Sequence, residues 1–490
     1  MLYIPEIEKI NKYHSPQYAY YDGFSTAYEV KINGKVCPVR SCRVSKDRFN
    51  TIWPGHQRDI AQSEWASFIS FFGDEEVTLE VKCNLPFENI YVRPLSKGIE
   101  TQIVDDTVIF TLKQNGNFVL ETDDSHGALH IFYSKNKEIP KPEDVTYYFG
   151  PGIHKPLLLN LKNNDSVFIH PEAVVFTTVY ASDVNNIHIF GGGVLNNSCQ
   201  ERIDEECYVD GPIGNIRMFK SRNIKIEDVI LIDSANWVCA LFNCKNIEID
   251  NIKIVGQWRY NTDGIDLTNT SNVSIKNSFI RSFDDSICVK ALNKFDVCEN
   301  IYVENCVCWC DWGKTLELGL ETSANEYRNI TFKSCDLIHN ATAAMAISNG
   351  NHAEIHDICY ENINVEFQST TRKQIYQDND EMVYIDDGKT DMAALIRLDN
   401  NLFSASYPEE NLSDEKYGYT HDVKFKNINV YTDIMDKKIK LHFISISEDT
   451  PTEKVYIDNI SVNGKDIDSI NNFEIIQENT MNFFYNGECI

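Results

Sequence analysis

The sequence has no long apolar run, no excess of basic residues and no cysteine framework, and each absence excludes a class of protein. No stretch approaches the ~20 apolar residues that a membrane helix needs. Lys and Arg number 45 against 73 Asp and Glu, which gives a net charge of −28. A charge of that size repels nucleic-acid phosphates and anionic lipid headgroups. We therefore expect neither nucleic acid nor a membrane surface as a partner.

The 15 cysteines are odd in number and lack the spacing of a disulfide framework. Three of them alternate at Cys306, Cys308 and Cys310, but no Cys-x-x-Cys pair or matching histidine accompanies them. We interpret these three as small core residues and predict no metal site and no cofactor. The first residues, MLYIPEIEKI, do not resemble a secretory signal. Reduced thiols and a cytoplasmic location are therefore expected.

A short phrase recurs along most of the chain: Asn, then Ile or Val, any residue, and an apolar residue. It begins at Asn186, Asn223, Asn246, Asn272, Asn300 and Asn329, with looser copies at Asp357, Asp422 and Lys454. Successive starts are 37, 23, 26, 28, 29, 28, 65 and 32 residues apart. The repeat therefore has a basic unit of between twenty and thirty residues.

Each unit holds two or three short runs of alternating polar and apolar residues, which is the period of strands. Short strands that cannot bury an apolar face alone, repeated at regular intervals, indicate stacked coils. We predict an all-β fold in which a parallel β-helix covers residues 141–490. A leucine-rich or propeller array is the alternative, but leucine is sparse in the phrase and no Trp-Asp signature recurs.

Residues 1–140 lack the phrase and contain alternating runs at Tyr28–Ile32, Val77–Val81 and Thr107–Leu112. This pattern predicts a separate N-terminal antiparallel β-sandwich domain. The stretch 368–419 interrupts the repeat and is rich in Asp and Asn. We expect it to project as long loops that carry function or mediate self-association, so a homo-oligomer formed through these loops is a hypothesis.

Three aspartates lie one coil apart. Asp284 and Asp285 follow Asp263 by 21 and 22 residues, so stacking would bring the three carboxylates together. Clustered carboxylates raise one another's proton affinity, which leaves one protonated while others stay ionised. Cleavage of a glycosidic bond needs that division between an acid and a base. A role as turn residues is the alternative for each aspartate taken alone.

The sequence Asn261-Thr262-Asp263-Gly264-Ile265-Asp266, followed one coil later by Asp284-Asp285, resembles the polygalacturonase family, glycoside hydrolase family 28. It also resembles the related dextranase and isopullulanase family 49, whose N-terminal sandwich is similar to the one predicted here. Both resemblances imply a right-handed parallel β-helix hydrolase that inverts the anomeric carbon. They imply Asp284 as the general acid, with Asp263 and Asp285 holding the attacking water. Asn261 belongs to the same motif and is a candidate for substrate binding.

The residues after the aspartates depart from the polygalacturonase pattern. Where that pattern has Gly-His-Gly and then Arg-Ile-Lys, this chain has Trp312-Gly313-Lys314 followed by Glu317 and Glu321. Two glutamates in place of a basic pair do not suit a polyanion. We expect both glutamates to contact a neutral sugar, with a catalytic or a buried structural role for Glu317 as alternatives. Lys290 either contacts a substrate hydroxyl or neutralises the aspartates.

Aromatic residues accompany the coils that carry the aspartates. Sugar rings present apolar C–H faces that pack on aromatic rings. We predict Trp312 and Tyr260 as sugar platforms and include Trp237 among the binding residues. The structural alternative is that each ring fills a corner of the coil.

These observations predict a glycoside hydrolase that cleaves an α-glucan or a galactose-containing oligosaccharide. A pectin or galacturonan hydrolase on the same scaffold is one rival. A lyase or epimerase acting on uronates is another, but it would need calcium or a basic cluster beside the aspartates. A non-catalytic glycan-binding β-helix is the third.

Overall fold

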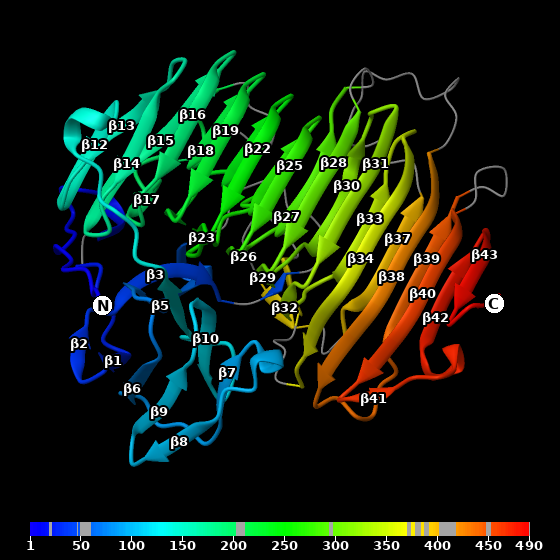
Figure 1. Cartoon of the computed structure of the whole chain (residues 1–490). Helices are drawn as coiled ribbons and strands as arrows, with labels where there is room; N and C mark the ends of the chain where they lie inside the picture. Colours follow the sequence, from blue (N-terminus) through cyan, green and yellow to red (C-terminus); the bar gives the residue numbers. More distant parts are fainter. Residues whose placement is uncertain are drawn as a thin grey trace.

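The computed structural model describes residues 1–18, 22–46, 48–49, 60–201, 211–293, 297–369, 374–377, 384–386, 392–400, 418–446 and 452–489. These residues form two five-stranded sheets near the N-terminus and one large sheet of 31 strands that winds into a coil (Figure 1). Five short 3-10 helices lie among them: η1 (Pro16–Tyr18), η2 (Ile60–Gln62), η3 (Leu95–Lys97), η4 (Pro142–Asp144) and η6 (Ile470–Asn472). No described helix has the length and hydrophobicity required to cross a bilayer.

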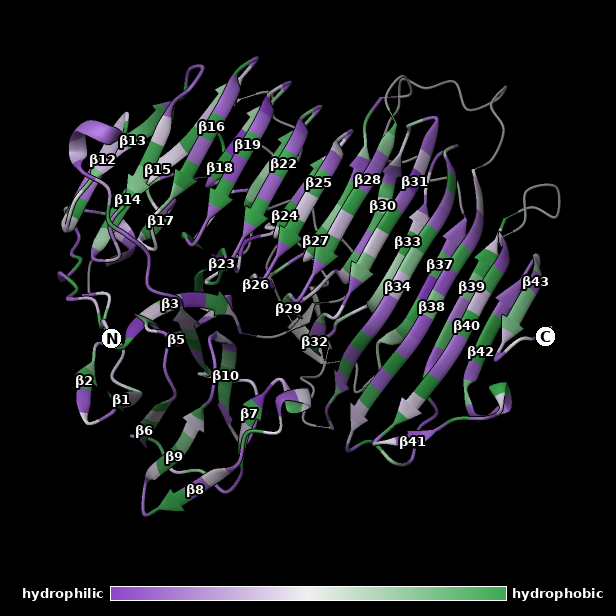
Figure 2. Ribbon diagram, in the orientation of Figure 1, coloured by the Kyte–Doolittle hydropathy of each residue, from purple (hydrophilic) through white to green (hydrophobic). Residues whose placement is uncertain are grey.

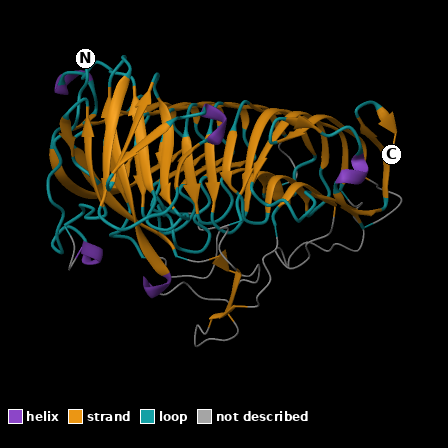
Figure 3. Cartoon of the chain, turned by 90° about the horizontal axis from the view of Figure 1, so that it is seen from below, coloured by secondary structure: helices purple, strands orange, loops and turns teal. Residues whose placement is uncertain are grey.

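The coil consists of three stacks of parallel strands, which we call ladders A, B and C. Each turn of the chain adds one strand to a ladder, so the coil is the predicted parallel β-helix. The strands stack side by side along its long axis, as the view from below also shows (Figure 3).

Ladder A contains β12 (Tyr147–Phe149), β14 (Ser166–Ile169), β16 (Asn185–Phe190), β19 (Arg222–Glu227), β22 (Lys245–Asp250), β25 (Ser271–Lys276), β28 (Cys298–Glu304), β31 (Glu326–Lys333), β34 (Glu354–Phe367), β38 (Tyr419–Thr432), β40 (Thr452–Val462) and β43 (Thr480–Tyr485). Ladder B contains β13 (Gly152–Asn160), β15 (Ala173–Ser182), β18 (Ile216–Phe219), β21 (Cys239–Phe242), β24 (Ile265–Thr268), β27 (Ile287–Ala291), β30 (Lys314–Thr322), β33 (Ala343–Asn349), β37 (Ala394–Asn400), β39 (Lys440–Ser445) and β42 (Glu474–Glu478). Ladder C contains β17 (Val194–Asn196), β20 (Ile230–Ile232), β23 (Lys253–Ile254), β26 (Phe279–Ser282), β29 (Val307–Cys310) and β32 (Asp336–His339). The short strands β41 (Lys465–Asp466) and β44 (Glu488–Cys489) pair antiparallel at the C-terminal end.

The recurring Asn of the sequence phrase has a defined place in ladder A. Asn223, Asn246 and Asn272 lie in the left-handed region, with φ of 54°, 60° and 59°. Asparagine tolerates this conformation better than most residues. The Nδ2 of each donates to the Oδ1 of the Asn one rung earlier, over 3.2, 3.0 and 3.1 Å. The amides therefore form a continuous side-chain stack, which explains the repeat.

The apolar residues of the phrase fill the inside of the coil. Ile224, Ile226, Ile247 and Ile249 are all buried in one core cluster that runs through the coil. Alternation of apolar and polar residues along these strands is visible in the hydropathy colouring (Figure 2). Cys306 and Cys308 lie in the same cluster. The fourteen described cysteines are all free.

The N-terminal strands form the predicted β-sandwich. One sheet contains β1 (Tyr28–Ile32), β2 (Lys35–Cys37), β6 (Val77–Cys83), β8 (Thr101–Val104) and β9 (Thr107–Leu112), and the other contains β3 (Arg40–Ser45), β5 (Ser63–Phe72), β7 (Ile90–Arg93), β10 (Gly116–Thr122) and β11 (Leu129–Ser134). The two sheets share a core that includes Ile32, Leu79 and Ile131. One detail differs from the prediction: β5 and β11 pair in parallel, so the second sheet is mixed.

The second sandwich sheet packs directly on ladder C. Phe68 and Phe132 of the sandwich lie in one apolar cluster with Phe279 and Trp309 of the coil. The sandwich therefore covers the outer face of ladder C.

The stretch 368–419 departs from the expectation of projecting loops. Within it, β37 is a strand of ladder B, paired in parallel with β33 and β39. The loop prediction is wrong for these residues, because Leu395, Ile396 and Leu398 are buried in the coil core. β35 (Gln374–Gln377) pairs with β36 (Tyr384–Asp386) and with β4 (Arg48–Phe49). Most of the remaining stretch lies outside the described residues, and self-association through it stays a prediction.

Candidate active site

The three predicted aspartates lie on the turns that connect ladder C to ladder B. Asp263 comes two residues before β24, and Asp284 and Asp285 lie between β26 and β27. Both aspartates of the pair therefore lie on a bend and not within a strand. Asp263 and Asp285 are buried, whereas Asp284 is partly exposed. A substrate would reach the Asp284 carboxyl first.

Lys290 is a buried cation that contacts two carboxylates of the cluster. Its Nζ lies 2.6 Å from Oδ2 of Asp263 and 3.1 Å from Oδ1 of Asp266. It also lies 4.1 Å from the ring centroid of Trp237. Burial alone would lower the pKa of Lys290, but the two carboxylates outweigh it and raise that pKa, so the ammonium persists. Of the two roles left open for Lys290, the structure supports neutralisation.

A second cation approaches the cluster from the next rung. The backbone N–H of Lys314 donates to Oδ1 of Asp285 over 2.8 Å, and its Nζ lies 2.8 Å from Oε1 of Glu317. Glu317 has no exposed surface. Burial and the charge of Asp285 raise its pKa to about 8, so Glu317 is largely protonated at neutral pH.

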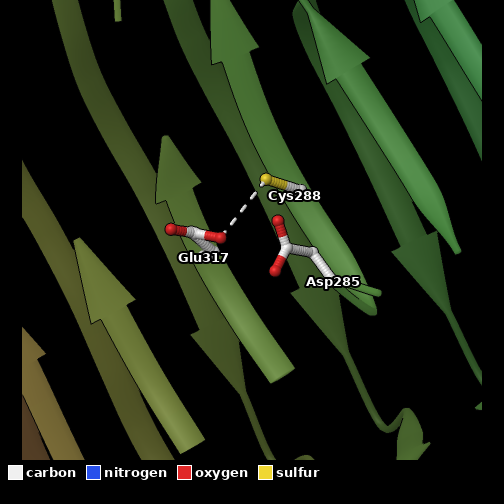
Figure 4. A group of neighbouring side chains, drawn as sticks. All are labelled: Asp285, Cys288 and Glu317. Carbon is white, nitrogen blue, oxygen red and sulfur yellow. Dashed lines mark hydrogen bonds between the residues drawn. The ribbon is translucent and has the colours of Figure 1, made fainter. Parts of the chain in front are cut away.

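Asp285, Cys288 and Glu317 point toward one another from adjoining rungs (Figure 4). The register pairs Cys288 with Glu317 directly, and the Sγ lies 4.0 Å from Oε2 of Glu317. One oxygen or sulfur atom from each of the three residues lies within 4.8 Å of the others. Among the described residues this is the group whose donor atoms could hold a metal ion. Lys314 already supplies a positive charge to its glutamate.

Gly313 packs closely against the turn of the preceding rung. A Cβ at this position would lie 2.5 Å from Oδ1 of Asp284, 2.4 Å from Oδ1 of Asp285 and 2.6 Å from the backbone N of Asp285. Any side chain here would collide with both carboxylates. Glycine therefore allows the turn 311–313 to pack against the turn that carries the acidic pair.

The environments of the two adjacent aspartates separate their pKa values. Burial, together with the charges of Asp263 and Asp285, raises the pKa of Asp284 well above its usual range. Burial also opposes ionisation of Asp285, but Lys314 and Lys290 outweigh it and lower the pKa of that group. The two environments therefore favour the protonated form of Asp284 and the ionised form of Asp285. Burial raises the pKa of Asp263 to about 6.

The aromatic predictions are only partly compatible with the structure. Trp312 is partly exposed and packs on Phe283 with an interplanar angle of 11°. Tyr260 has no exposed surface and lies edge-on beneath Trp312, with ring centroids 5.5 Å apart. Trp237 is also buried. The platform role is therefore wrong for Tyr260, which supports Trp312, and direct binding is wrong for Trp237, whose ring faces Lys290, because neither ring presents a face to solvent.

Asn261 and Glu321 both lie beside the cluster. Asn261 is partly exposed and adopts a left-handed φ of 54° two residues before Asp263. Glu321 is buried, and its charge contributes to the raised pKa of Asp263. Both positions are compatible with a binding role, which stays a prediction.

Four residues of this site were not singled out from the sequence: Asp266, Cys288, Gly313 and Lys314. Asp266, Cys288 and Glu317 are register partners on β24, β27 and β30. The repeat could have identified the register partners. Once Asp263 was placed, an alignment of the ladder B strands of successive rungs would have brought together the residues at equivalent outward positions.

Lys290→Met should be strongly destabilising. The variant leaves Asp263 and Asp266 buried without their cation, and removal of one partner from a buried ion pair costs about 3–5 kcal/mol. This loss of stability should grow as pH rises above the usual carboxyl pKa. Above that pH both aspartates ionise freely in the unfolded chain, whereas the fold must either bury their charges or keep them protonated. Urea unfolding at pH 5 and pH 8 measures it. Lys276→Met is the matched control: its ion pair with Glu304 is exposed and longer, at 3.8 Å, and an equal loss there would contradict the assignment.

The site lies inside a segment with recognisable relatives. The model of the family described as "Glycosyl hydrolases family 28" matches residues 166–393, which include all three aspartates. The chain is related to the family 28 glycosyl hydrolases.

The family 28 similarity extends to curated proteins. An exopolygalacturonase of Oenothera organensis is 28% identical over 162 residues, 31% of this chain and 43% of that protein. Rhamnogalacturonase A of Emericella nidulans is 31% identical over 159 residues, 31% of this chain and 28% of that protein. The chain thus spans less than half the length of these relatives.

A solved structure shares the whole architecture. Dex49A from Penicillium minioluteum aligns with 99% of this chain and 96% of its own, with a TM-score of 0.68 and 12% identity. The predicted resemblance to families 28 and 49 is therefore confirmed, by sequence for family 28 and by fold for Dex49A.

Proposed function

We propose that this protein is a glycoside hydrolase that cleaves a neutral oligosaccharide with inversion. The observation that carries the proposal is the pair of neighbouring aspartates with opposed pKa shifts, of which only Asp284 is partly exposed. The relation to family 28 supports hydrolysis of a glycosidic bond.

The geometry suggests the following roles. Asp284 donates its proton to the glycosidic oxygen as the bond to the anomeric carbon breaks. Asp285, ionised beside Lys314, accepts a proton from the water that attacks the opposite face of that carbon. Asp263, fixed by Lys290, helps to hold that water. Trp312, packed on Phe283, offers a ring to the apolar face of the sugar.

A neutral sugar is favoured by the charges around the site. The basic side chains that face the cluster already have acidic partners: Lys290 pairs with Asp263 and Asp266, and Lys314 pairs with Glu317. Further along ladder B, Nε of Arg397 lies 2.5 Å from Oδ2 of Asp399. A galacturonate carboxylate would have to compete with the buried carboxylates of Asp263, Asp285 and Asp399 for these cations, at a large electrostatic cost.

A pectic substrate is the second candidate, because the curated relatives include exopolygalacturonases and rhamnogalacturonases. We also propose a cytoplasmic location, supported by the free state of the described cysteines. A cytoplasmic hydrolase would act on imported oligosaccharides rather than on polymer.

A panel of purified oligosaccharides tests the proposal. Neutral α-glucan and galactose-containing oligomers should be cleaved, and galacturonan oligomers should not. NMR of the first product formed should show the anomer opposite to that of the substrate. Faster cleavage of galacturonan would replace the substrate class, and retention would remove the assigned water. Binding without cleavage by the native protein would indicate a glycan-binding protein.

A further inference from the structure

A buried polar contact links the N-terminal sandwich to the turns that carry the acidic pair. Arg281 lies on β26, three residues before Asp284, and its side chain has no exposed surface. Its Nε donates to Oδ2 of Asp311 over 3.3 Å, and its Nη1 lies 3.3 Å from Nε2 of His130. The guanidinium carbon lies 3.7 Å from the ring centroid of Trp309. Three groups thus hold one buried arginine.

The histidine of this contact comes from the sandwich. His130 lies on β11, and its Nδ1 lies 2.8 Å from the carbonyl oxygen of Ser67. A carbonyl can only accept, so Nδ1 carries the proton and Nε2 presents a lone pair to Arg281. Burial, with the charge of Arg281, lowers the pKa of His130 to about 3. The imidazole is therefore a neutral acceptor at every pH at which the protein would work.

Three other titratable groups, His339, Glu121 and Arg93, contact one another near this histidine. Nε2 of His339 lies 2.5 Å from Oε1 of Glu121, and Arg93 contacts the same glutamate over 2.7 Å. These groups contact one another across the same interface, and His130 contacts Arg281 from the sandwich side.

Asp311 connects Arg281 to the turns beside the acidic pair. Its Oδ1 accepts from Nε1 of Trp309 over 2.8 Å, and its backbone N–H donates to the carbonyl of Ser282 over 3.1 Å. Two residues later comes Gly313, where any Cβ would collide with the carboxyl groups of Asp284 and Asp285. The Arg281–Asp311 pair therefore joins the turn that carries Asp284 to the turn that packs against it.

We infer that His130 of the N-terminal sandwich is a positioning residue for the general acid, acting through Arg281 and Asp311. The inference rests on the proposed function, because it assigns Asp284 the role of acid. Without the imidazole acceptor, the buried guanidinium loses a partner and must turn toward water or another acceptor. Arg281 then holds Asp311 less firmly, which loosens the packing of the two turns against each other. The sandwich is accordingly part of the catalytic apparatus and not only a cover for ladder C.

The test compares three variants of the full chain. His130→Phe removes the acceptor and keeps a ring, and His130→Gln restores a neutral acceptor. Phe132→Leu is the matched control, because Phe132 lies on the same strand and packs on Phe279, with centroids 5.2 Å apart, in the same apolar layer. Each variant is measured by hydrogen exchange at residues 282–286 and 311–314, and by kcat, KM and the pH profile on the best oligosaccharide of the panel.

His130→Phe should speed exchange in both turns and lower kcat by about tenfold with little change in KM. Its alkaline limb should move to lower pH, because an Asp284 more open to water loses part of its raised pKa. His130→Gln should recover most of the activity, and Phe132→Leu should lower only the melting temperature. Equal exchange or equal loss of kcat in His130→Phe and Phe132→Leu would overturn the inference. An inactive native protein would overturn the proposed function instead, and exchange would still decide whether His130 holds the turns.

Discussion

Asp284→Asn should lower turnover by about 10²–10⁴-fold, the contribution typical of a general acid. Asn keeps the size of the side chain and the oxygen that accepts from the backbone N–H of Asp285 over 3.1 Å. It cannot release a proton to the leaving oxygen. The measurement is kcat on the best substrate of the panel, alongside the melting temperature. Comparable turnover in the variant would remove Asp284 from the role of acid.

The raised pKa of Asp284 also predicts how stability and activity change with pH. When the pKa of an acid is higher in the folded than in the unfolded state, the free energy of unfolding decreases as pH rises from the unfolded pKa to the folded pKa. The native protein should therefore lose stability over that interval, and Asp284→Asn should lose less, so it should be equally or more stable at alkaline pH. Activity of the native protein should fall on the alkaline side as Asp284 ionises. On the acidic side it should fall as Asp263, with a pKa of about 6, and then Asp285 take up protons.

Gly313→Ala should abolish most activity although it adds only one carbon. The new Cβ would approach Oδ1 of Asp284 and Oδ1 of Asp285 to 2.5 and 2.4 Å, and one of its contacts is backbone. The carboxylates must rotate or the turns must part, and a displacement of about 1 Å in an active site can cost about 10²-fold in rate. Overpacking should also reduce the free energy of unfolding by about 1–3 kcal/mol.

The matched control for this substitution is Gly150→Ala. Gly150 also has an ordinary φ, and its added Cβ would meet only the ring of Tyr148, at 3.3 Å. That variant should retain full activity. If Gly313→Ala kept both its activity and its stability, the close packing of the two turns would be contradicted. If both variants lost activity equally, the effect would belong to glycine replacement in general.

The repeat phrase was sufficient to predict the coil because it encodes two local requirements at once. Its Asn must tolerate a left-handed backbone and bond to the Asn of the next rung, as Asn246 and Asn272 do. Its Ile and Val must alternate with polar residues to fill the interior. Both requirements involve neighbours one rung away, so they recur at the spacing of the rungs and are visible in the sequence. The repeat did not predict strand β37, because this single rung lacks the phrase and lies within a long Asp-rich stretch.

A spacing of 21 or 22 residues was enough to predict the three clustered aspartates, because stacked rungs bring residues at that spacing close together. The tertiary structure was needed to see which aromatic ring is partly exposed, since the burial of Tyr260 and Trp237 depends on what packs over them. It also decided that Lys290 neutralises Asp263 and Asp266, and that His130 reaches Arg281 across 151 residues of chain. These contacts depend on how two sheets dock, and no local pattern of residues records such docking.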